Sequence, residues 1–217
     1  MPTNILYMEA TQVLLPTGLE ERLGLPIELR VRATWETFLE LLPECEYRLE
    51  YDQREMISIM GFASEKHENL VIAIAFVLRT LLGTKDFQFY ASNLALHIPG
   101  GQKRYFNADL TVVKGKSERK QLKGNMYAIS NPVLLVEVLS PSTYSYDLAN
   151  KASAYREIPS LQQLLFVDSE STHLISQSRQ ENSNKWTLIE YKDKADQVSL
   201  FNGAAFELGQ LYANLEQ

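Results

Sequence analysis

The alternation of apolar and polar residues in the first third of the chain predicts a short helix followed by two strands. Thr34 is suited to cap a helix that Pro43 ends. Residues 47–60 then have the apolar pattern of two short strands, with 52–54 as the turn between them. Residues 1–33 lack such a pattern, and we expect an irregular N-terminal extension followed by a single domain over 34–217.

A longer helix is predicted next. Ser64 is suited to cap it, its residues run over 65–82, and Gly83 ends it. The middle of this segment is apolar on every side. We therefore expect a helix that is buried on most of its faces and is not amphipathic.

The rest of the chain has mostly strand patterns. Residues 132–139 form an almost continuous aliphatic run, which is typical of a central strand covered on both faces. Helical spacing over 144–157 follows it. Together these patterns predict an α/β domain (mixed α+β) in which helices flank a central mixed sheet. The other predicted strands cover residues 87–92, 94–98, 105–113, 161–167, 172–177 and 186–191, and a small helix is expected near the end of the chain.

Composition narrows the class of protein. The chain has 217 residues, 45% of them hydrophobic, which is enough for one compact domain. Its single cysteine, Cys45, excludes an internal disulfide framework. The longest apolar run, 70–78, is far shorter than the ~20 residues of a membrane helix, and the N-terminus lacks the features of a signal peptide. We expect a cytoplasmic protein without a membrane partner.

The charge is distributed unevenly along the chain. A net charge of −6 argues against a general nucleic-acid coat protein, which needs clustered cations. Residues 103–123, however, hold seven basic and two acidic side chains. This segment is either a solvated loop or a local anion-binding face. Its basic residues are Lys103, Arg104, Lys114, Lys116, Arg119, Lys120 and Lys123.

Two carboxylates occur within apolar strand patterns. Glu137 lies in the run PVLLVEVLS and Asp109 in FNADLTVV. An ionised carboxylate among Leu and Val costs several kcal/mol unless a cation compensates it. A buried arginine partner for Glu137 is one solution. If the two strands are neighbours, both carboxylates can instead converge on a hard cation such as magnesium.

The segment after Glu137 adds three spaced polar residues. Asp147, Lys151 and Tyr155 fall at i, i+4 and i+8, which places them on one face of a helix. Asp147 and Lys151 are compatible with a surface ion pair. Because the helix directly follows the strand of Glu137, the lysine can also reach that end of the sheet, where an amine can orient water and neutralise phosphate charge.

These residues resemble a known family. The run RLEYDQREM…SEKH…NADLTVV…VEVLSPST…D…K…Y…LLFVD, spread over about residues 34–215, is similar to the Uma-type family of proposed bacterial endonucleases. That family belongs to the restriction-endonuclease-like PD-(D/E)xK superfamily. The resemblance therefore implies a restriction-endonuclease-like core with a central mixed sheet.

The resemblance also implies residue roles. Asp109 and Glu137 match the two acidic positions of the motif, and Glu50 resembles a glutamate contributed from an N-terminal element; these three are the implied metal ligands. Lys151 resembles a helix lysine that replaces the standard strand lysine, where this chain has Leu139. Arg54 stands where the family hairpin usually has glycine, a change that we expect to alter the turn. The supporting residues implied are Glu55, His67, Ser140, Asp147 and Tyr155.

The implied activity is hydrolysis of a phosphodiester bond in nucleic acid, DNA in the first instance, with Mg²⁺ or Mn²⁺ as cofactor. The basic segment connects Asp109 to Glu137, so it is a candidate to track the nucleic-acid backbone. Two alternatives stay open: a nuclease-fold binding or scaffold protein without hydrolysis, and a hydrolase of small phosphoesters. Because nucleases that cut both strands often pair two sites by symmetry, a homodimer is expected.

Overall fold

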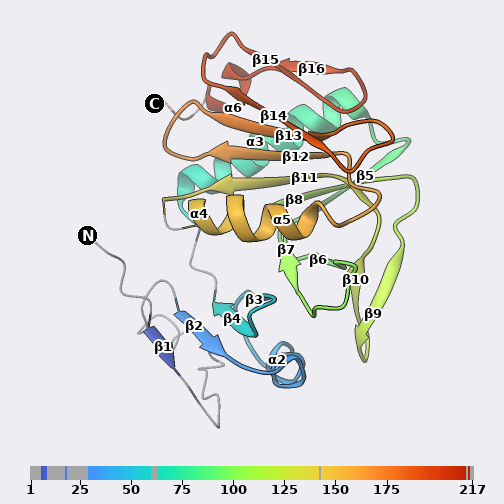
Figure 1. Ribbon diagram of the computed structural model, residues 1–217. Helices are drawn as coiled ribbons and strands as arrows, with labels where there is room; N and C mark the ends of the chain where they lie inside the picture. Colours follow the sequence, from blue (N-terminus) through green and yellow to red (C-terminus); the bar gives the residue numbers. More distant parts are fainter. Residues whose placement is uncertain are drawn as a thin grey trace.

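A six-stranded mixed sheet forms the centre of the molecule in the computed structural model, which describes residues 6–8, 18, 29–59, 63–141, 143–213 and 215 (Figure 1). The strand order is β14-β13-β12-β11-β8-β5. Only β11 and β12 run parallel; the other neighbouring strands are antiparallel. The strands are β5 (Phe87–Ala91), β8 (Leu110–Lys114), β11 (Pro132–Leu139), β12 (Gln163–Asp168), β13 (Leu174–Arg179) and β14 (Trp186–Tyr191).

Strand β11 is the centre of this sheet, as the aliphatic run predicted. All eight of its residues are buried. A parallel pair needs a crossover connection, and the chain between β11 and β12 supplies it as one helical segment. This segment consists of α4 (Tyr144–Tyr146), the π-helix η1 (Asp147–Lys151) and α5 (Ala152–Tyr155).

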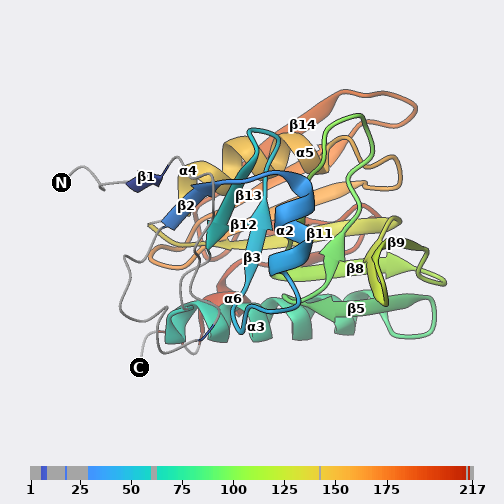
Figure 2. The same ribbon diagram turned by 90° about the horizontal axis from the view of Figure 1, so that it is seen from below.

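Helices cover both faces of the sheet, which confirms the predicted fold class. Figure 2 shows α3 (Glu65–Leu82) on one side of the sheet and the α4–η1–α5 segment on the other. The short helix α6 (Gly209–Tyr212) lies against α3. On the α3 side, Leu70, Ile74 and Leu78 belong to the same apolar cluster as Leu134 and Val136 of β11.

The bounds of α3 confirm the sequence prediction, but its burial does not. The side chain of Ser64 accepts a hydrogen bond from the His67 N–H at 3.2 Å, and Gly83 has φ +74°. The expectation of burial on most faces was wrong, because Ile72 is 66% and Phe76 is 71% exposed. The buried residues of the helix, Leu70, Ile74 and Leu78, are spaced by four and face the sheet. The apolar side chains of Ile72 and Phe76, on the opposite side of the helix, are exposed to solvent.

A second, four-stranded sheet has the order β1-β2-β4-β3 and packs with α2 (Trp35–Leu41). The predicted capping by Thr34 and the strand pair within 47–60 are confirmed. The described part of residues 1–33 is not irregular, because it contains two strands. Their pairing is non-local, and such short strands leave little pattern in the sequence. The rest of that stretch lies outside the described residues. The strands are β1 (Leu6–Met8), β2 (Leu29–Arg32), β3 (Leu49–Tyr51) and β4 (Met56–Ile59).

A third sheet has the order β7-β6-β10-β9 and contains much of the basic segment. The alternative of a solvated loop does not describe the whole segment, because Arg119–Lys123 is strand β9, paired antiparallel with β10. The sequence of β9 is almost entirely polar, so it has no alternating apolar pattern that would predict a strand. Charged residues are common on edge strands. A two-stranded ribbon lies near the C-terminus. These elements are β6 (Ala95–Leu96), β7 (Phe106–Asn107), β10 (Met126–Ile129), β15 (Gln197–Ser199) and β16 (Ala205–Glu207).

One further finding concerns membranes. Within the described residues, no helix has both the length and the apolar character that crossing a bilayer requires.

Candidate active site

The hairpin of β3 and β4 carries Glu50 into the interior. Main-chain hydrogen bonds in both directions join Tyr51 to Tyr105, at 2.9 and 2.8 Å, and hold the hairpin against the segment that leads to β7. Glu50, one residue earlier on β3, is completely buried. Its place in the site therefore depends on contacts between segments about 50 residues apart.

The turn of this hairpin differs from the expectation for Arg54. The Asp52 side chain accepts hydrogen bonds from the N–H groups of Arg54 at 2.8 Å and Met56 at 3.3 Å. The residue with positive φ is Glu55, at 60°. The left-handed conformation thus falls one residue later than the arginine, and Glu55 is exposed at the tip of the turn. The structure does not bring Glu55 into the site.

A break between β7 and β8 positions Asp109. The predicted strand over 105–113 is interrupted at Ala108 and Asp109, directly before β8. There the Asp109 Oδ2 atom accepts a hydrogen bond from the Val138 N–H at 2.8 Å. The side chain takes a main-chain donor of the neighbouring strand, next to Glu137, and this fixes the carboxylate beside the glutamate.

Lys151 joins the acidic residues at the buried side of the site. Its Nζ atom lies 2.9 Å from Glu50 Oε1 and 3.1 Å from Glu137 Oε1. It lies 3.4 Å from Asp147 Oδ1 and donates a hydrogen bond to the Asn107 carbonyl at 3.3 Å. The lysine belongs to the π-helical turn η1, and such turns are frequent at functional sites. The predicted convergence of this helix on the strand of Glu137 is confirmed.

Tyr155 completes the surroundings of Glu137. Its hydroxyl donates a hydrogen bond to Glu137 Oε1 at 2.7 Å, and its side chain is fully buried. The residue is one turn beyond Lys151, as the spacing predicted. One carboxylate oxygen of Glu137 is therefore held by two donors from the same helical segment.

Arg48 and His67 lie at the other side of the site, around Asp109. Arg48 Nη1 and His67 Nε2 are each 3.5 Å from Asp109 Oδ1. Arg48 Nη2 is 3.5 Å from Glu50 Oε1. The sequence leaves an arginine open as the partner of Glu137, but among the described residues its cationic partner is Lys151. The arginine instead lies between Asp109 and Glu50.

The site holds more negative than positive charge. Four buried carboxylates face two permanent cations, which leaves two negative charges uncompensated when His67 is neutral. The carboxylates are Glu50, Asp109, Glu137 and Asp147, and the cations are Arg48 and Lys151. Burying such an excess is unfavourable unless protons or further cations join it.

Burial and the neighbouring charges together shift the pKa values of Glu137, Asp109 and Lys151. Burial raises the pKa of Glu137 well above its ordinary value, although the charge of Lys151 opposes the shift. Burial would also raise the pKa of Asp109, but the hydrogen bond from His67 and the charge of Arg48 together lower it to about 2. Burial works against the charge of Lys151, yet the carboxylates of Glu137 and Glu50 raise the pKa of the lysine. The ionised form of Glu137 is therefore disfavoured, and a proton or a further cation at Glu137 would relieve the excess negative charge.

Several buried oxygens of the site have no hydrogen-bond donor among the described residues. They are Glu50 Oε2 and Asn107 Oδ1; Asp147 Oδ1 likewise accepts no hydrogen bond, although Lys151 Nζ lies 3.4 Å from it as an ion-pair partner. All three are hydrogen-bond acceptors, and carboxylate and amide oxygens are the ligands that hard divalent cations prefer. Together with the excess negative charge, these oxygens fit a divalent cation. No group of three or more His, Cys, Asp or Glu side chains within the described ranges is preformed as a metal site, and amine and guanidinium nitrogens lie among the carboxylates.

Ser140, which was predicted, and Asn107, which was not, lie near the other residues of the site. Ser140 closes the turn into α4 through hydrogen bonds with Thr143, at 3.3 Å from the Thr143 N–H to Ser140 Oγ. Asn107 was not predicted, yet its carbonyl accepts hydrogen bonds from both Lys151 and Arg48, each at 3.3 Å. A main-chain acceptor leaves no signal in the sequence, so sequence reasoning could not have found it.

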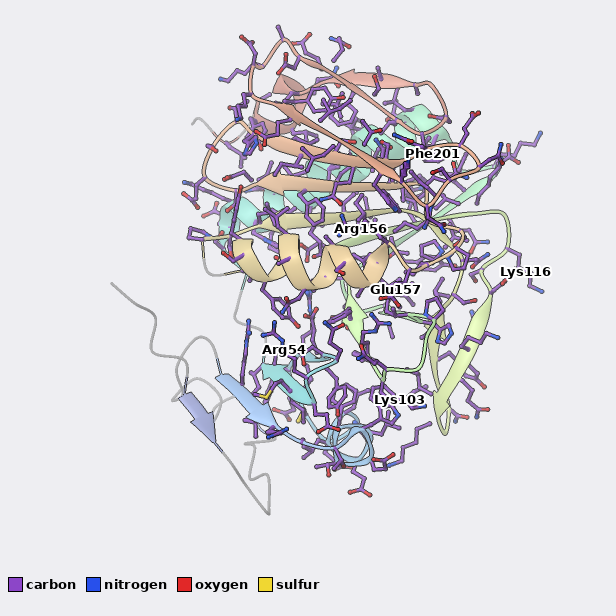
Figure 3. All side chains as sticks on the ribbon, viewed as in Figure 1. Arg54, Lys103, Lys116, Arg156, Glu157 and Phe201 are labelled. Carbon is purple, nitrogen blue, oxygen red and sulfur yellow. The ribbon has the colours of Figure 1, made fainter. Side chains whose placement is uncertain are left out.

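The basic side chains of residues 103–123 are exposed except for one. Arg104 is buried, and its guanidinium donates to Glu157 Oε1 at 2.8 Å and to the Pro99 carbonyl at 3.1 Å. Because its guanidinium already pairs with Glu157, Arg104 would have to leave this ion pair to contact a nucleic acid. Figure 3 shows Lys116 at the outer edge of the molecule. The exposed members are Lys103, Lys114, Lys116, Arg119, Lys120 and Lys123.

The mixed sheet, its crossover helix and the acidic residues at the junction of β8 and β11 define a restriction-endonuclease-like α/β domain. The comparison with protein families agrees with this class. The chain belongs to the Uma2 family, whose model carries the description "Putative restriction endonuclease" and matches residues 35–212. The resemblance inferred from the sequence motifs is confirmed.

Two relatives from Synechocystis sp. (strain PCC 6803) are similar to this chain. Uncharacterized protein sll1609 is 29% identical over 153 residues, which cover 70% of this chain and 84% of the relative. Uncharacterized protein slr1290 is 29% identical over 186 residues, covering 82% of this chain and 94% of the relative. Both similarities extend over most of the domain.

Proposed function

We propose that this protein is a metal-dependent endonuclease that hydrolyses phosphodiester bonds of nucleic acid, with DNA as the expected substrate. The observation that carries the proposal is a buried cluster in which Lys151 pairs with Glu50 and Glu137, and the Val138 N–H holds Asp109 beside Glu137. Its excess negative charge, and buried oxygens that accept no hydrogen bond within the described residues, fit a divalent cation. The family description supports the same reaction class.

Asp109, Glu137 and Glu50 would hold Mg²⁺ or Mn²⁺. When bound, such an ion lowers the pKa of a water ligand and neutralises charge on the phosphate. The protein's own groups prepare the carboxylates for this task. The Val138 N–H fixes one oxygen of Asp109, which leaves the other directed toward Arg48 and His67.

Lys151 and Tyr155 orient Glu137 from the opposite side. The amine supplies a positive charge near Glu137 from the helix, whereas Leu139 occupies the position two residues after Glu137 in the strand. The 3.1 Å contact supports a functional role for Lys151 in place of the missing strand lysine. A cation at this point can assist in neutralising the phosphate during hydrolysis.

The exposed basic residues of the hairpin β9–β10 and its flanks would contact the nucleic-acid backbone. They lie on the segment between β8 and β11, which joins these strands at the Val113–Pro132 end, whereas Asp109 and Glu137 lie at the other end of the strand pair. A bound backbone would therefore have to extend from this surface to the site. Because these contacts neutralise phosphates, binding should depend on salt. A cytoplasmic location and a homodimer remain predictions.

The test is incubation of the purified protein with supercoiled plasmid, single-stranded DNA and RNA in Mg²⁺, in Mn²⁺ and in EDTA. We expect cleavage with either metal, none in EDTA, and loss of cleavage in Asp109→Asn and Glu137→Gln. Glu190→Gln, which removes an exposed carboxylate on β14, is the matched control and should cleave like the wild type. Cleavage that survives both site substitutions would refute the proposal.

Two other outcomes would replace the proposal with an alternative. DNA binding without cleavage in any metal would favour a binding or scaffold protein. Hydrolysis of bis(4-nitrophenyl) phosphate without cleavage of any nucleic acid would favour a hydrolase of small phosphoesters.

A further inference from the structure

Arg48 bridges two carboxylates of the site. Its Nη1 atom is 3.5 Å from Asp109 Oδ1, and its Nη2 atom is 3.5 Å from Glu50 Oε1. Nη2 also donates to the Asn107 carbonyl at 3.3 Å. The guanidinium thus lies where a cation shared by Asp109 and Glu50 would be, and these are two of the three carboxylates assigned to the metal.

The contacts of Arg48 are loose compared with those of Lys151. Charge-assisted hydrogen bonds between nitrogen and carboxylate are commonly about 2.7–2.9 Å long. Lys151 approaches this length, at 2.9 Å from Glu50, whereas both carboxylate contacts of Arg48 are 3.5 Å. The Arg48 Nε atom is buried without a hydrogen-bond acceptor among the described residues. Arg48 is therefore the less firmly held of the two cations.

Arg48 also has a route out of the site. Its side chain is 22% exposed, whereas the side chains of Lys151, Glu50 and Asp109 are at most 5% exposed. An arginine cannot give up its charge by deprotonation in a protein. A divalent ion bound to the same carboxylates would repel the guanidinium strongly at this distance, and movement of the side chain is the available relief.

We propose that Arg48 is a displaceable internal cation, which neutralises Asp109 and Glu50 in the metal-free protein and withdraws toward solvent when a divalent metal binds. The inference rests on the proposed function, because it assumes that these carboxylates take the metal. In this role Arg48 competes with the metal and holds the carboxylates together in its absence.

The test is Mn²⁺ affinity, measured by isothermal titration calorimetry on the full chain without nucleic acid. Arg48→Met removes the competing charge, and we expect Mn²⁺ to bind about tenfold or more tightly than to the wild type. Arg54→Met, which removes an exposed arginine from the same hairpin, is the matched control and should bind Mn²⁺ as the wild type does. Arg48→Met should also lower the melting temperature of the metal-free protein, and saturating Mn²⁺ should recover the difference.

The outcomes separate this inference from the proposed function. If wild type and Arg48→Met bind Mn²⁺ equally, or the variant binds more weakly, the inference is wrong and the proposed metal site stands. If neither the wild type nor any variant binds Mn²⁺, the proposed function fails and the inference fails with it. If Arg48→Met does not fold, Arg48→Lys retains the charge without the two-armed bridge and should show a smaller gain in affinity; no gain would overturn the inference.

A different observation concerns the outer face of α3. Ile72 and Phe76, one turn apart, are exposed, and a groove of about 710 Å³ lies beside them against the ribbon of β15 and β16. Figure 2 shows α3 along one side of the molecule, with the sheet on its inner side. Two large exposed apolar side chains on one helix face are typical of an interaction surface.

The charges on this face are self-complementary. Successive residues of a helix are rotated by about 100°, so Glu68 and Arg79 lie on the same flank of the face, near opposite ends. Antiparallel packing of two α3 helices about a two-fold axis would place Ile72 of each copy on Phe76 of the other. The same operation would place Glu68 of each copy against Arg79 of the other, and an isologous contact requires such symmetry. We infer that the occupant of this face is a second copy of this chain.

Light scattering coupled to size-exclusion chromatography tests the dimer. We expect a wild-type dimer, a monomer for Phe76→Glu, and a weaker dimer for Arg79→Glu that the double variant Glu68→Arg/Arg79→Glu restores. Leu188→Glu, which alters an exposed leucine on β14, should leave the dimer unchanged. A monomeric wild type over a wide concentration range, or a dimer that persists in Phe76→Glu, would overturn this inference.

Discussion

The two faces of β11 differ in chemistry although they belong to one strand. Leu134, Val136 and Val138 point to the α3 side and join a wholly apolar cluster. Leu135 and Leu139 point to the opposite side, where Glu137 lies between them in the strand and contacts Lys151 and Tyr155. Both faces therefore bury apolar side chains, but only the face opposite α3 also holds the candidate site.

The difference has an energetic meaning. Apolar burial on the α3 face contributes favourable free energy without polar groups that need partners. The opposite face buries carboxylates in excess of cations, and that costs free energy. We therefore expect changes on the first face to alter stability, and changes at the carboxylates on the second to alter activity.

The largest expected effect is on activity. Glu137→Gln should lower nucleic-acid cleavage by about 10³-fold or more, the scale of losing one member of a catalytic group. Its free energy of unfolding should stay equal to the wild type or rise, because the substitution removes one charge from a site that has too many negative ones. Cleavage assays and urea unfolding measure the two quantities. A loss of stability as large as that of a core deletion would show that the carboxylate is structural.

Removal of Lys151, unlike that of the Glu137 charge, should lower the free energy of unfolding. Lys151→Met leaves the carboxylates with Arg48 as the remaining permanent cation, and breaking a buried ion pair by removing one partner costs about 3–5 kcal/mol. Thermal and urea unfolding measure this loss. Lys192→Met, at an exposed ion pair on the surface, is the control and should change stability by less than about 1 kcal/mol. Equal stability of the two variants would mean that Lys151 does not balance the site.

The α3 face should respond in stability alone. Leu134→Ala removes a fully buried side chain, and such deletions cost about 2–5 kcal/mol. Cleavage per folded molecule should be unchanged at a temperature where the variant is folded. A fall in specific activity comparable to that of Glu137→Gln would erase the distinction between the two faces.

The smallest effect is expected outside both faces. Replacing Lys114, Lys116, Arg119 and Lys120 together by Gln should weaken DNA binding and lower the slope of log affinity against log salt by about 0.9 for each phosphate that the protein no longer neutralises. The cleavage rate at saturating DNA should remain. Fluorescence anisotropy over a range of salt concentrations measures the slope, and an unchanged slope would remove this surface from DNA binding.

Much of the fold could be predicted where the signal is local. The aliphatic run of β11 predicts a central strand, and a single carboxylate within it marks the site. The spacing of Asp147, Lys151 and Tyr155 predicts one helix face, which the structure confirms. These signals need only the period of a strand or a helix.

Other features depend on contacts between distant segments. Arg104 pairs with Glu157, 53 residues away in the sequence. The cluster of basic residues around Arg104 therefore gave no indication that this arginine has an internal partner. The position of Arg48 depends on how the β3–β4 hairpin packs against the segment around Asn107. The exposure of Phe76 depends on which side of α3 the sheet occupies. None of these is encoded in a residue pattern of short range.

The central claim is that the excess negative charge of the buried site accommodates a divalent cation. Anomalous diffraction from crystals of the full chain soaked in Mn²⁺ tests it most directly. We predict one strong peak bonded to carboxylate oxygens of Asp109 and Glu137, with the guanidinium of Arg48 moved away from Asp109. A site in which no manganese is bound at saturating concentration, with Lys151 and Arg48 still in contact with all the carboxylates, would contradict the account.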